Sequence, residues 1–244
     1  MLKGFFLATL CGALLAASTV ADAAPEEFQV LLIGNSHSSK NDLPDLIATL
    51  IEIGHPDASV YVDAAPRWVF LAERIGDKVT QKTLESRAWT QVVLQAQKYS
   101  SSGRYFYPTD AAEEWIRRVR QLDAEPILFP EWPRAGNAEE GPRVHALHMG
   151  IAQREPACVA PMGLAWQIVI DENPEIQLHA RDGNHSTKAG ALLAAYVLYQ
   201  AITGDAAAEL PHIERVKIDA EVQKILRTAA SNAHRTLLSC PDSL

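Results

Sequence analysis

The sequence predicts an α/β fold, specifically a flavodoxin-like three-layer α/β/α sandwich around a five-stranded parallel sheet. Two observations predict this fold: short apolar runs alternate with longer segments of helical periodicity, and no repeat, low-complexity tract or linker interrupts the alternation. The runs expected to be strands are residues 28–33, 59–63, 91–95, 126–129 and 157–160. Strands separated by helices pair in parallel through right-handed crossovers, so the loops that follow them gather at one edge of the sheet.

Each segment between these strands is expected to form a helix. The first such segment has Leu43, Leu46, Ile47, Leu50 and Ile51 at helical spacing. The helices expected in all are residues 42–53, 67–86, 109–122, 139–153, 163–170, 187–202 and 220–238. Open α/β sheets bind their ligands at the carboxyl ends of the strands, so the residues after each strand are the first candidates for a site.

The N-terminus has the pattern of a secretory signal peptide. Lys3 precedes an apolar run over residues 4–20, and small residues occupy the positions that a signal peptidase reads, which predicts cleavage before Ala24. Residues 1–23 are therefore expected to be the signal peptide and residues 24–244 a single domain. A retained membrane anchor is the alternative, although the run is short for a membrane span. The mature protein is expected to be periplasmic or secreted, with no stable membrane insertion.

Charge and cysteine usage limit the classes of partner. The net charge is −8 and no basic cluster occurs, which argues against nucleic acid as a partner. After signal cleavage two cysteines remain, Cys158 and Cys240. In an oxidising compartment they either form a disulfide or stay as two separate buried thiols, and spacing alone does not decide between these.

The stretch VLLIGNSHSSKNDLP, residues 30–44, carries the first functional signal. A buried strand ends there at Gly34, and Ser36 follows at the carboxyl edge of the expected sheet. A serine at this place is either a helix cap or a nucleophile. A nucleophilic serine needs a base, which is usually an imidazole oriented by a carboxylate.

A suitable base occurs late in the chain, in the polar run ARDGNHSTKAG over residues 180–190. His185 lies on a turn-forming loop directly before an apolar helix, and Asp182 precedes it by three residues. This single loop therefore supplies an imidazole together with a carboxylate that can orient it. Either motif alone is usually a turn, but the two together, on the proper sides of a parallel-sheet pattern, indicate a serine hydrolase.

At these two motifs the sequence resembles the SGNH hydrolases, also called GDSL esterases/lipases. Gly34-Asn35-Ser36 and Asp182-Gly183-Asn184-His185 match that superfamily in order, spacing and context. The similarity is strongest to a bacterial branch with GNS and DGxH motifs, and it extends over residues 30–204. The resemblance implies that Ser36 is the nucleophile, His185 the general base and Asp182 the residue that orients it. It also implies that no metal or organic cofactor is needed.

The same resemblance implies an oxyanion hole with three hydrogen-bond donors. The Ser36 amide is the first donor. The expected glycine after the second strand is absent, which leaves a backbone amide of Arg67 or Trp68 as the second donor, or no donor at all. The expected Asn after the third strand is also absent, and Gln95, or else Gln97, is predicted to offer its side-chain amide instead.

Other residues at the same edge are candidates for substrate binding. His37 either contacts the acyl or leaving group or is a solvated residue of the first turn. Trp132 either forms a wall of the substrate cleft or packs in its loop, and the tyrosines at positions 99, 105 and 107 have the same two interpretations. The pair His145 and His148 has a spacing that can hold zinc, but without a third ligand nearby a solvated helix face is favoured.

These features predict an exported serine esterase whose substrate is a small-molecule or carbohydrate ester, with short acyl groups favoured. Two alternatives share the same scaffold. One is an O-acyltransferase that passes the acyl group to a sugar instead of water. The other is a binding module without catalytic activity.

Overall fold

Five parallel strands form the centre of the protein, in the spatial order β2-β1-β3-β4-β5. Their bounds are β1 Glu27–Ile33, β2 Ser59–Ala64, β3 Gln91–Gln95, β4 Glu125–Phe129 and β5 Cys158–Val159. The computed structural model describes Met1, residues 26–237 and Cys240, so residues 2–23 of the expected signal peptide lie outside the described residues. The strand order confirms the predicted flavodoxin-like sheet.

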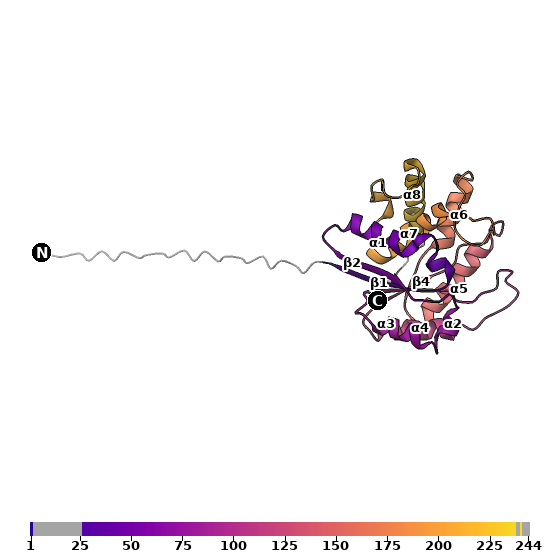
Figure 1. Cartoon of the computed structure of the whole chain (residues 1–244), viewed down its shortest axis with the longest axis horizontal. Coiled ribbons are helices and arrows are strands. Elements are labelled where there is room, and N and C mark those ends of the chain that lie inside the picture. Colours follow the sequence, from indigo (N-terminus) through magenta and orange to yellow (C-terminus); the bar gives the residue numbers. More distant parts are fainter. Residues whose placement is uncertain (2–25, 238–239, 241–244) are drawn as a thin grey trace.

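Helices cover both faces of this sheet (Figure 1). Their bounds are α1 Leu43–Gly54, α2 Leu71–Arg74, α3 Lys78–Glu85, α4 Asp110–Arg120, α5 Glu140–Arg154, α6 Met162–Glu172, α7 Lys188–Thr203 and α8 Ala220–Thr236. Helices α1, α6, α7 and α8 lie on one face, and α2, α3 and α4 lie on the other (Figure 1). In the described part of the chain, every helix is too short or too polar to span a bilayer.

The alternation of side chains along β1 creates two separate cores. Val30 and Leu32 pack into the core beneath α1, α6, α7 and α8, whereas Leu31 and Ile33 pack into the core beneath α2 and α4. All four side chains are completely buried. A strand that is apolar on both faces is typical of a parallel sheet covered by helices on each side.

The single helix predicted for residues 67–86 is wrong, because two short helices occupy this segment. Helix α2 ends at Arg74, and α3 begins only at Lys78. Asp77 starts the second helix by accepting a hydrogen bond from the Thr80 amide. Residues 66–70 form a loop without helical turns, and this loop lies beside the site described below.

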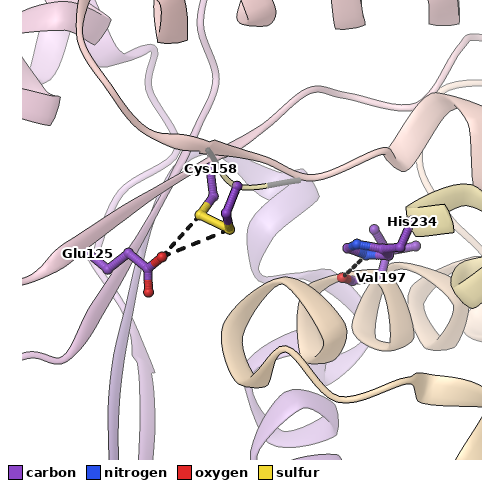
Figure 2. Close-up of a disulfide and its surroundings, with 5 residues drawn as sticks. Glu125, Cys158, Val197 and His234 are labelled. Atoms are coloured by element: carbon purple, nitrogen blue, oxygen red, sulfur yellow. Dashed lines mark hydrogen bonds between the residues drawn. A yellow bond between two sulfur atoms is a disulfide. The ribbon is translucent and has the colours of Figure 1, made fainter. Parts of the chain in front are cut away.

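Cys158 and Cys240 form a disulfide, which decides between the alternatives that the sequence left open (Figure 2). Cys158 belongs to β5, and Cys240 follows α8, so the bond ties the C-terminal segment to the edge of the sheet. The Glu125 carboxyl lies beside it, with Oε1 at 3.0 Å from Cys158 Sγ. Burial raises the pKa of Glu125 above its ordinary value.

Candidate active site

Strand β1 delivers Ser36 to the carboxyl edge of the sheet. Gly34 ends the strand where a Cβ atom would collide with the side chains of Gln95 and Ser38, so only glycine fits. A short 3-10 turn, Ser36–Ser38, follows, and its cap is Asn35, whose side chain accepts a hydrogen bond from the His37 amide at 2.9 Å. The cap of this turn is Asn35 and not Ser36. The Ser36 hydroxyl is therefore available to another partner.

That partner is His185. Ser36 Oγ lies 2.9 Å from His185 Nε2, although 149 positions separate the two residues. On its other side the imidazole donates from Nδ1 to Asp182 Oδ2 at 2.6 Å. A neutral imidazole that donates from Nδ1 keeps a lone pair on Nε2, so its Nε2 can accept the serine proton. The structure therefore brings the three residues predicted for the triad into one hydrogen-bonded chain.

The Asp182 side chain also organises the loop that carries the imidazole. Its Oδ1 accepts hydrogen bonds from the amides of Asn184 at 3.0 Å and His185 at 2.9 Å. Gly183 between them adopts a left-handed backbone with φ of 67°. The His185 contact is the largest of several hydrogen bonds that lower the pKa of Asp182 well below its ordinary value. The carboxylate is therefore ionised throughout the neutral range, as an orienting acid must be.

Asn41, on the loop after β1, forms hydrogen bonds to the loop that carries His185. This contact was not predicted from the sequence. Asn41 Nδ2 donates to the carbonyl of Ser186 at 2.9 Å and to the Ser186 hydroxyl at 3.1 Å. To reach them, Asn41 and Asp42 both adopt left-handed conformations, with φ of 54° and 58°. The only signal in the sequence is the Asn-Asp-Leu-Pro pattern, which belongs to the resemblance.

Gln95 does not have the arrangement predicted for an oxyanion donor. Its side chain is completely buried beneath the turn, where Oε1 accepts from the Asn35 amide at 2.7 Å and Nε2 donates to Glu131 Oε1 at 2.7 Å. The alternative, Gln97, donates from Nε2 to the carbonyls of Lys98 and Pro108. Both glutamine amides therefore support loops, and Gln95 holds the peptide that precedes Ser36.

The loop after β2 lies beside this turn and carries Arg67. The backbone of Arg67 is left-handed with φ of 75°, the conformation that favours glycine. Its guanidinium is 57% exposed and pairs with Asp77 at 3.1 Å. The exposed guanidinium pairs with a carboxylate, so the backbone amide is the group of Arg67 that fits the oxyanion role.

A buried arginine, Arg74, fixes the same loop. Its guanidinium donates to the carbonyls of Gly34 at 2.6 Å, Arg67 at 2.5 Å and Pro66 at 3.1 Å, and to the Thr80 hydroxyl at 2.7 Å. In a trans peptide the N–H points opposite to the C=O, so the two amides that follow Pro66 and Arg67 point away from this guanidinium. No pattern in the sequence distinguishes this arginine from a surface residue of a helix.

His37 and Trp132 are both buried, so neither forms a wall of an open cleft. Trp132 packs in its loop, which is the second of its two predicted interpretations, and His37 is not the solvated residue that was its alternative. His37 is 6% exposed and Trp132 is 2% exposed. The imidazole of His37 lies between the rings of Trp132, at 4.8 Å, and His185, at 5.2 Å. Trp132 donates from its indole nitrogen to the Asn184 carbonyl at 2.8 Å. Both residues therefore pack against the loop that carries His185, the candidate base.

His148 is likewise buried, so the solvated helix face predicted for His145 and His148 is wrong for this residue. Its Nδ1 lies 2.7 Å from the Val144 carbonyl on the same helix. Burial lowers the pKa of His148 to about 4, which keeps the ring neutral.

The loop after β3 forms a pocket with helix α5. The pocket has a volume of about 390 Å³ and is lined mainly by aromatic and aliphatic side chains. The aromatic ones include the three tyrosines predicted from the sequence, Tyr99, Tyr105 and Tyr107. The Tyr99 hydroxyl donates to Glu131 Oε2 at 3.3 Å, and Glu131 Oε1 lies 3.4 Å from Asn35 Nδ2. Two contacts therefore connect the pocket to the residue before Ser36.

The comparisons with known proteins agree with this fold. No family model and no curated protein matches the chain. Among solved structures, a candidate SGNH hydrolase from Slackia heliotrinireducens matches with a TM-score of 0.59 and 24% identity, covering 72% of this chain and 98% of that one. A DUF4886 family protein from Bacteroides uniformis matches with a TM-score of 0.70 and 17% identity, over 89% of this chain and 98% of that one.

A mutant of Axe2, an acetyl-xylooligosaccharide esterase from Geobacillus, matches with a TM-score of 0.57 and 12% identity, over 73% of this chain and 94% of that one. The chain thus has the fold of the SGNH hydrolases, and the resemblance read from its motifs is confirmed at the level of the fold. At these identities the likeness does not extend to substrate or activity.

Proposed function

We propose that this protein is a serine hydrolase of the SGNH type that acts on ester bonds. The observation that carries the proposal is the continuous hydrogen-bonded chain from Ser36 Oγ through His185 to Asp182, with distances of 2.9 and 2.6 Å. Hydrogen-bond reach between nucleophile and base, with the base oriented by a third group, is the geometric requirement for this chemistry. Axe2, an esterase with the same fold, makes ester hydrolysis the reaction to test first.

In the proposed reaction Ser36 Oγ attacks the ester carbonyl while His185 Nε2 takes the hydroxyl proton. Asp182 stabilises the imidazolium that forms, without taking a proton itself. The imidazolium then protonates the leaving alcohol, and an acyl-enzyme remains on Ser36. Water activated by the same imidazole releases the acid and restores the hydroxyl.

The oxyanion of the tetrahedral intermediate needs donors that are already in place. We assign this role to the Ser36 amide and to an amide of the loop that Arg74 fixes, from Arg67 or Trp68. The support is the direction of the Pro66 and Arg67 carbonyls toward the buried guanidinium. Gln95 is then a supporting residue that holds the Asn35 amide and not a donor to the oxyanion.

For the substrate we propose an ester with a short acyl group, carried by a small molecule or a carbohydrate. The support is the aromatic pocket under the loop after β3, because flat apolar rings suit both sugar faces and acyl groups. None of its lining residues belongs to the proposed triad, and its connection to the site runs through Tyr99 and Glu131 to Asn35. Axe2, which shares the fold, is an acetyl-xylooligosaccharide esterase. Acetylated xylooligosaccharides and p-nitrophenyl esters of increasing chain length therefore belong in one screening panel.

Labelling by a fluorophosphonate probe tests the proposed function directly. The wild-type protein should become labelled at Ser36 and should hydrolyse p-nitrophenyl acetate, whereas Ser36→Ala should do neither. Ser38→Ala is the matched control, because that hydroxyl lies on the same turn and donates to the Asn35 carbonyl. Equal and weak labelling of the wild type and Ser36→Ala, without hydrolysis, would contradict the proposal that the protein is an enzyme. If a sugar acceptor makes transfer faster than hydrolysis, the protein is an acyltransferase.

We further propose that the protein is exported and that residues 1–23 are removed. The support is the apolar run before Ala24 together with the disulfide, which suits an oxidising compartment. N-terminal sequencing of protein recovered from the periplasm or the medium tests this proposal. A mature chain that begins at Ala24 is expected, and a chain that begins at Met1 contradicts it.

A further inference from the structure

A column of aromatic rings runs from the candidate base into the core. The His185 ring is stacked on His37, at 5.2 Å between centroids and 23° between planes. His37 contacts Trp132 at 4.8 Å, and Trp132 is stacked on Trp166 at 4.6 Å and 7°. Trp166 in turn meets His179 edge-on at 4.8 Å. His185 and His179 are thus the partly exposed ends of a packed series whose three inner rings, those of His37, Trp132 and Trp166, are buried.

The same column holds the backbone directly before His185. The Asn184 carbonyl accepts from the Trp132 indole N–H at 2.8 Å and lies 3.2 Å from His37 Nε2. From the opposite side, Asp182 Oδ1 binds the amides of residues 184 and 185. The Asn184 peptide groups are therefore fixed at both their donor and acceptor ends, which leaves the imidazole little freedom to move away from Ser36.

We propose that His37 and Trp132 are positioning residues that hold the His185 imidazole at hydrogen-bond distance from the Ser36 hydroxyl. This inference rests on the proposed function. Neither residue needs to touch the substrate, since both are buried behind the base. Shifts of about 1 Å in a reacting group can cost on the order of 100-fold in rate, so a rigid support behind the base has a direct effect on catalysis.

The surroundings of His37 add a dependence on pH. Its Nδ1 lies 3.1 Å from Asn35 Oδ1 and its Nε2 lies 3.2 Å from the Asn184 carbonyl, so each ring nitrogen faces an oxygen acceptor. Only the protonated ring can donate to both. The ionisable groups around it are Glu131, which favours protonation, and His185 and Arg134, which oppose it. Burial outweighs the attraction of Glu131, and the pKa of His37 is lowered, so the ring is neutral at neutral pH.

Neutrality of His37 matters because His185 has to become positively charged during the proposed reaction. A second positive charge in a stacked ring at 5.2 Å would disfavour that imidazolium. As the pH falls, protonation of His37 would place a positive charge beside the ring that has to become an imidazolium. Acid should therefore slow the proposed reaction more steeply when His37 is present than when it is replaced by a ring that cannot be protonated.

Two variants that keep an aromatic ring test the proposal. Trp132→Phe keeps an aromatic ring but removes the indole N–H that donates to the Asn184 carbonyl, together with part of the stacked ring surface. It should lower kcat about 10-fold while KM changes less than about twofold. His37→Phe keeps a stacked ring but cannot be protonated. Its kcat/KM should fall less steeply in acid than that of the wild type, because no second positive charge can form beside His185.

Trp89→Phe is the matched control for lost packing and a lost hydrogen bond. Trp89 lies between α3 and β3 and is 5% exposed. Its indole nitrogen donates to the Thr83 carbonyl at 3.2 Å. This variant should lower the unfolding temperature about as much as Trp132→Phe does, with kcat unchanged. A purely structural role of Trp132 predicts the same behaviour for both variants, which would overturn the proposal.

Labelling by the fluorophosphonate probe separates the two levels of the hypothesis. If the wild type reacts and both ring-keeping variants react at the same rate with unchanged pH profiles, the positioning role is wrong while the proposed function stands. If the wild type reacts no faster than Ser36→Ala, both proposals fail. Slower labelling of a folded Trp132→Phe, against normal labelling of Trp89→Phe, is the result that we expect.

Discussion

At the scale of single residues, the carboxylate of Asp182 orients the imidazole of the candidate base. Its carboxylate accepts three hydrogen bonds, from its own loop's amides and from His185 Nδ1. These bonds exist in the folded protein only, so they lower the pKa of the carboxyl relative to the unfolded chain. The ionised side chain therefore favours both the folded loop and the imidazole orientation that leaves Nε2 free to accept a proton.

Asp182→Asn should lower kcat by about 10⁴-fold while leaving the protein folded, since an amide keeps the size but favours the wrong imidazole tautomer. Initial rates on p-nitrophenyl acetate measure this change. Asp171→Asn is a suitable control, because that carboxylate lies on α6 and accepts only from Gln167 Nε2 among the contacts described. Equal rates for Asp182→Asn and the wild type would remove Asp182 from the mechanism.

The same variant makes a prediction about stability and pH. A lowered folded-state pKa means that the stabilisation is present above the ordinary aspartate value of about 3.9 and is lost as the pH falls through the lowered value. The wild type should therefore exceed Asp182→Asn in unfolding temperature at neutral pH, and the difference should shrink below about pH 4. Thermal unfolding of both proteins across that range tests the sign.

The position of the candidate triad was easier to predict from the sequence than the side chains that support it, for a physical reason. Ser36, Asp182 and His185 lie on polar turns at predictable ends of strands and helices, and short turns with these residue types occur in few arrangements. Gln95, His37 and Trp132 lie at the same sheet edge, but whether such a side chain turns outward or inward depends on packing from distant segments. The Asn35 cap, the Glu131 carboxylate and the Asn184 carbonyl direct them inward.

At the scale of elements, the loop between β2 and α2 depends on one buried guanidinium. Arg74 is fully buried and donates four hydrogen bonds, three of them to carbonyls on the loops after β1 and β2. These hydrogen bonds hold the loop after β1, which contains the Ser36 turn, next to the loop after β2, which carries Arg67. The prediction of one continuous helix here failed because these contacts favour a loop over the helical first turn.

Arg74→Met should lower the free energy of unfolding by about 3 kcal/mol or more, because the apolar chain leaves buried carbonyls without donors. It should also lower kcat, since the amides after Pro66 and Arg67 lose their fixed direction. Urea denaturation measures the first effect and steady-state kinetics the second. Arg74→Lys should recover part of the stability, as an ammonium can still donate to some of these carbonyls. Unchanged stability in Arg74→Met would contradict this account of the loop.

Arg67→Gly distinguishes the backbone of the loop from its side chain. The left-handed conformation at φ of 75° costs a residue with a Cβ about 1–2 kcal/mol, and glycine avoids that cost. In the lost pair with Asp77 the guanidinium is 57% exposed and the carboxylate side chain is 9% exposed, and we take its contribution as that of a surface pair, about 0–1 kcal/mol. We therefore expect stability that is equal or slightly higher, with kcat within about threefold of the wild type, because the amide is retained. A loss of kcat of tenfold or more would assign the role to the guanidinium.

At the scale of the whole molecule, the site and the disulfide occupy different parts of the sheet. Ser36, Gln95 and Glu131 gather where β1, β3 and β4 end, whereas the disulfide lies beside Glu125, the first residue of β4 (Figure 2). The parallel topology was predictable from the alternation of strands and helices, and it alone brings the loops together at one edge. The pairing of Cys158 with Cys240 was not predictable, because it depends on the path of the chain after α8.

Removing the disulfide should therefore destabilise the fold without changing the chemistry. The bond closes a loop between residues 82 positions apart, and a cross-link of this kind contributes about 2–4 kcal/mol, mainly by restricting the unfolded chain. A Cys158→Ser, Cys240→Ser double variant should unfold at a lower urea concentration than the oxidised wild type, with kcat on p-nitrophenyl acetate at 25 °C unchanged. Dithiothreitol should shift the wild type toward the variant and leave the variant unaffected. A loss of kcat in the folded double variant would mean that the position of the edge strand β5 affects the Ser36 turn. The site would then not be independent of the disulfide.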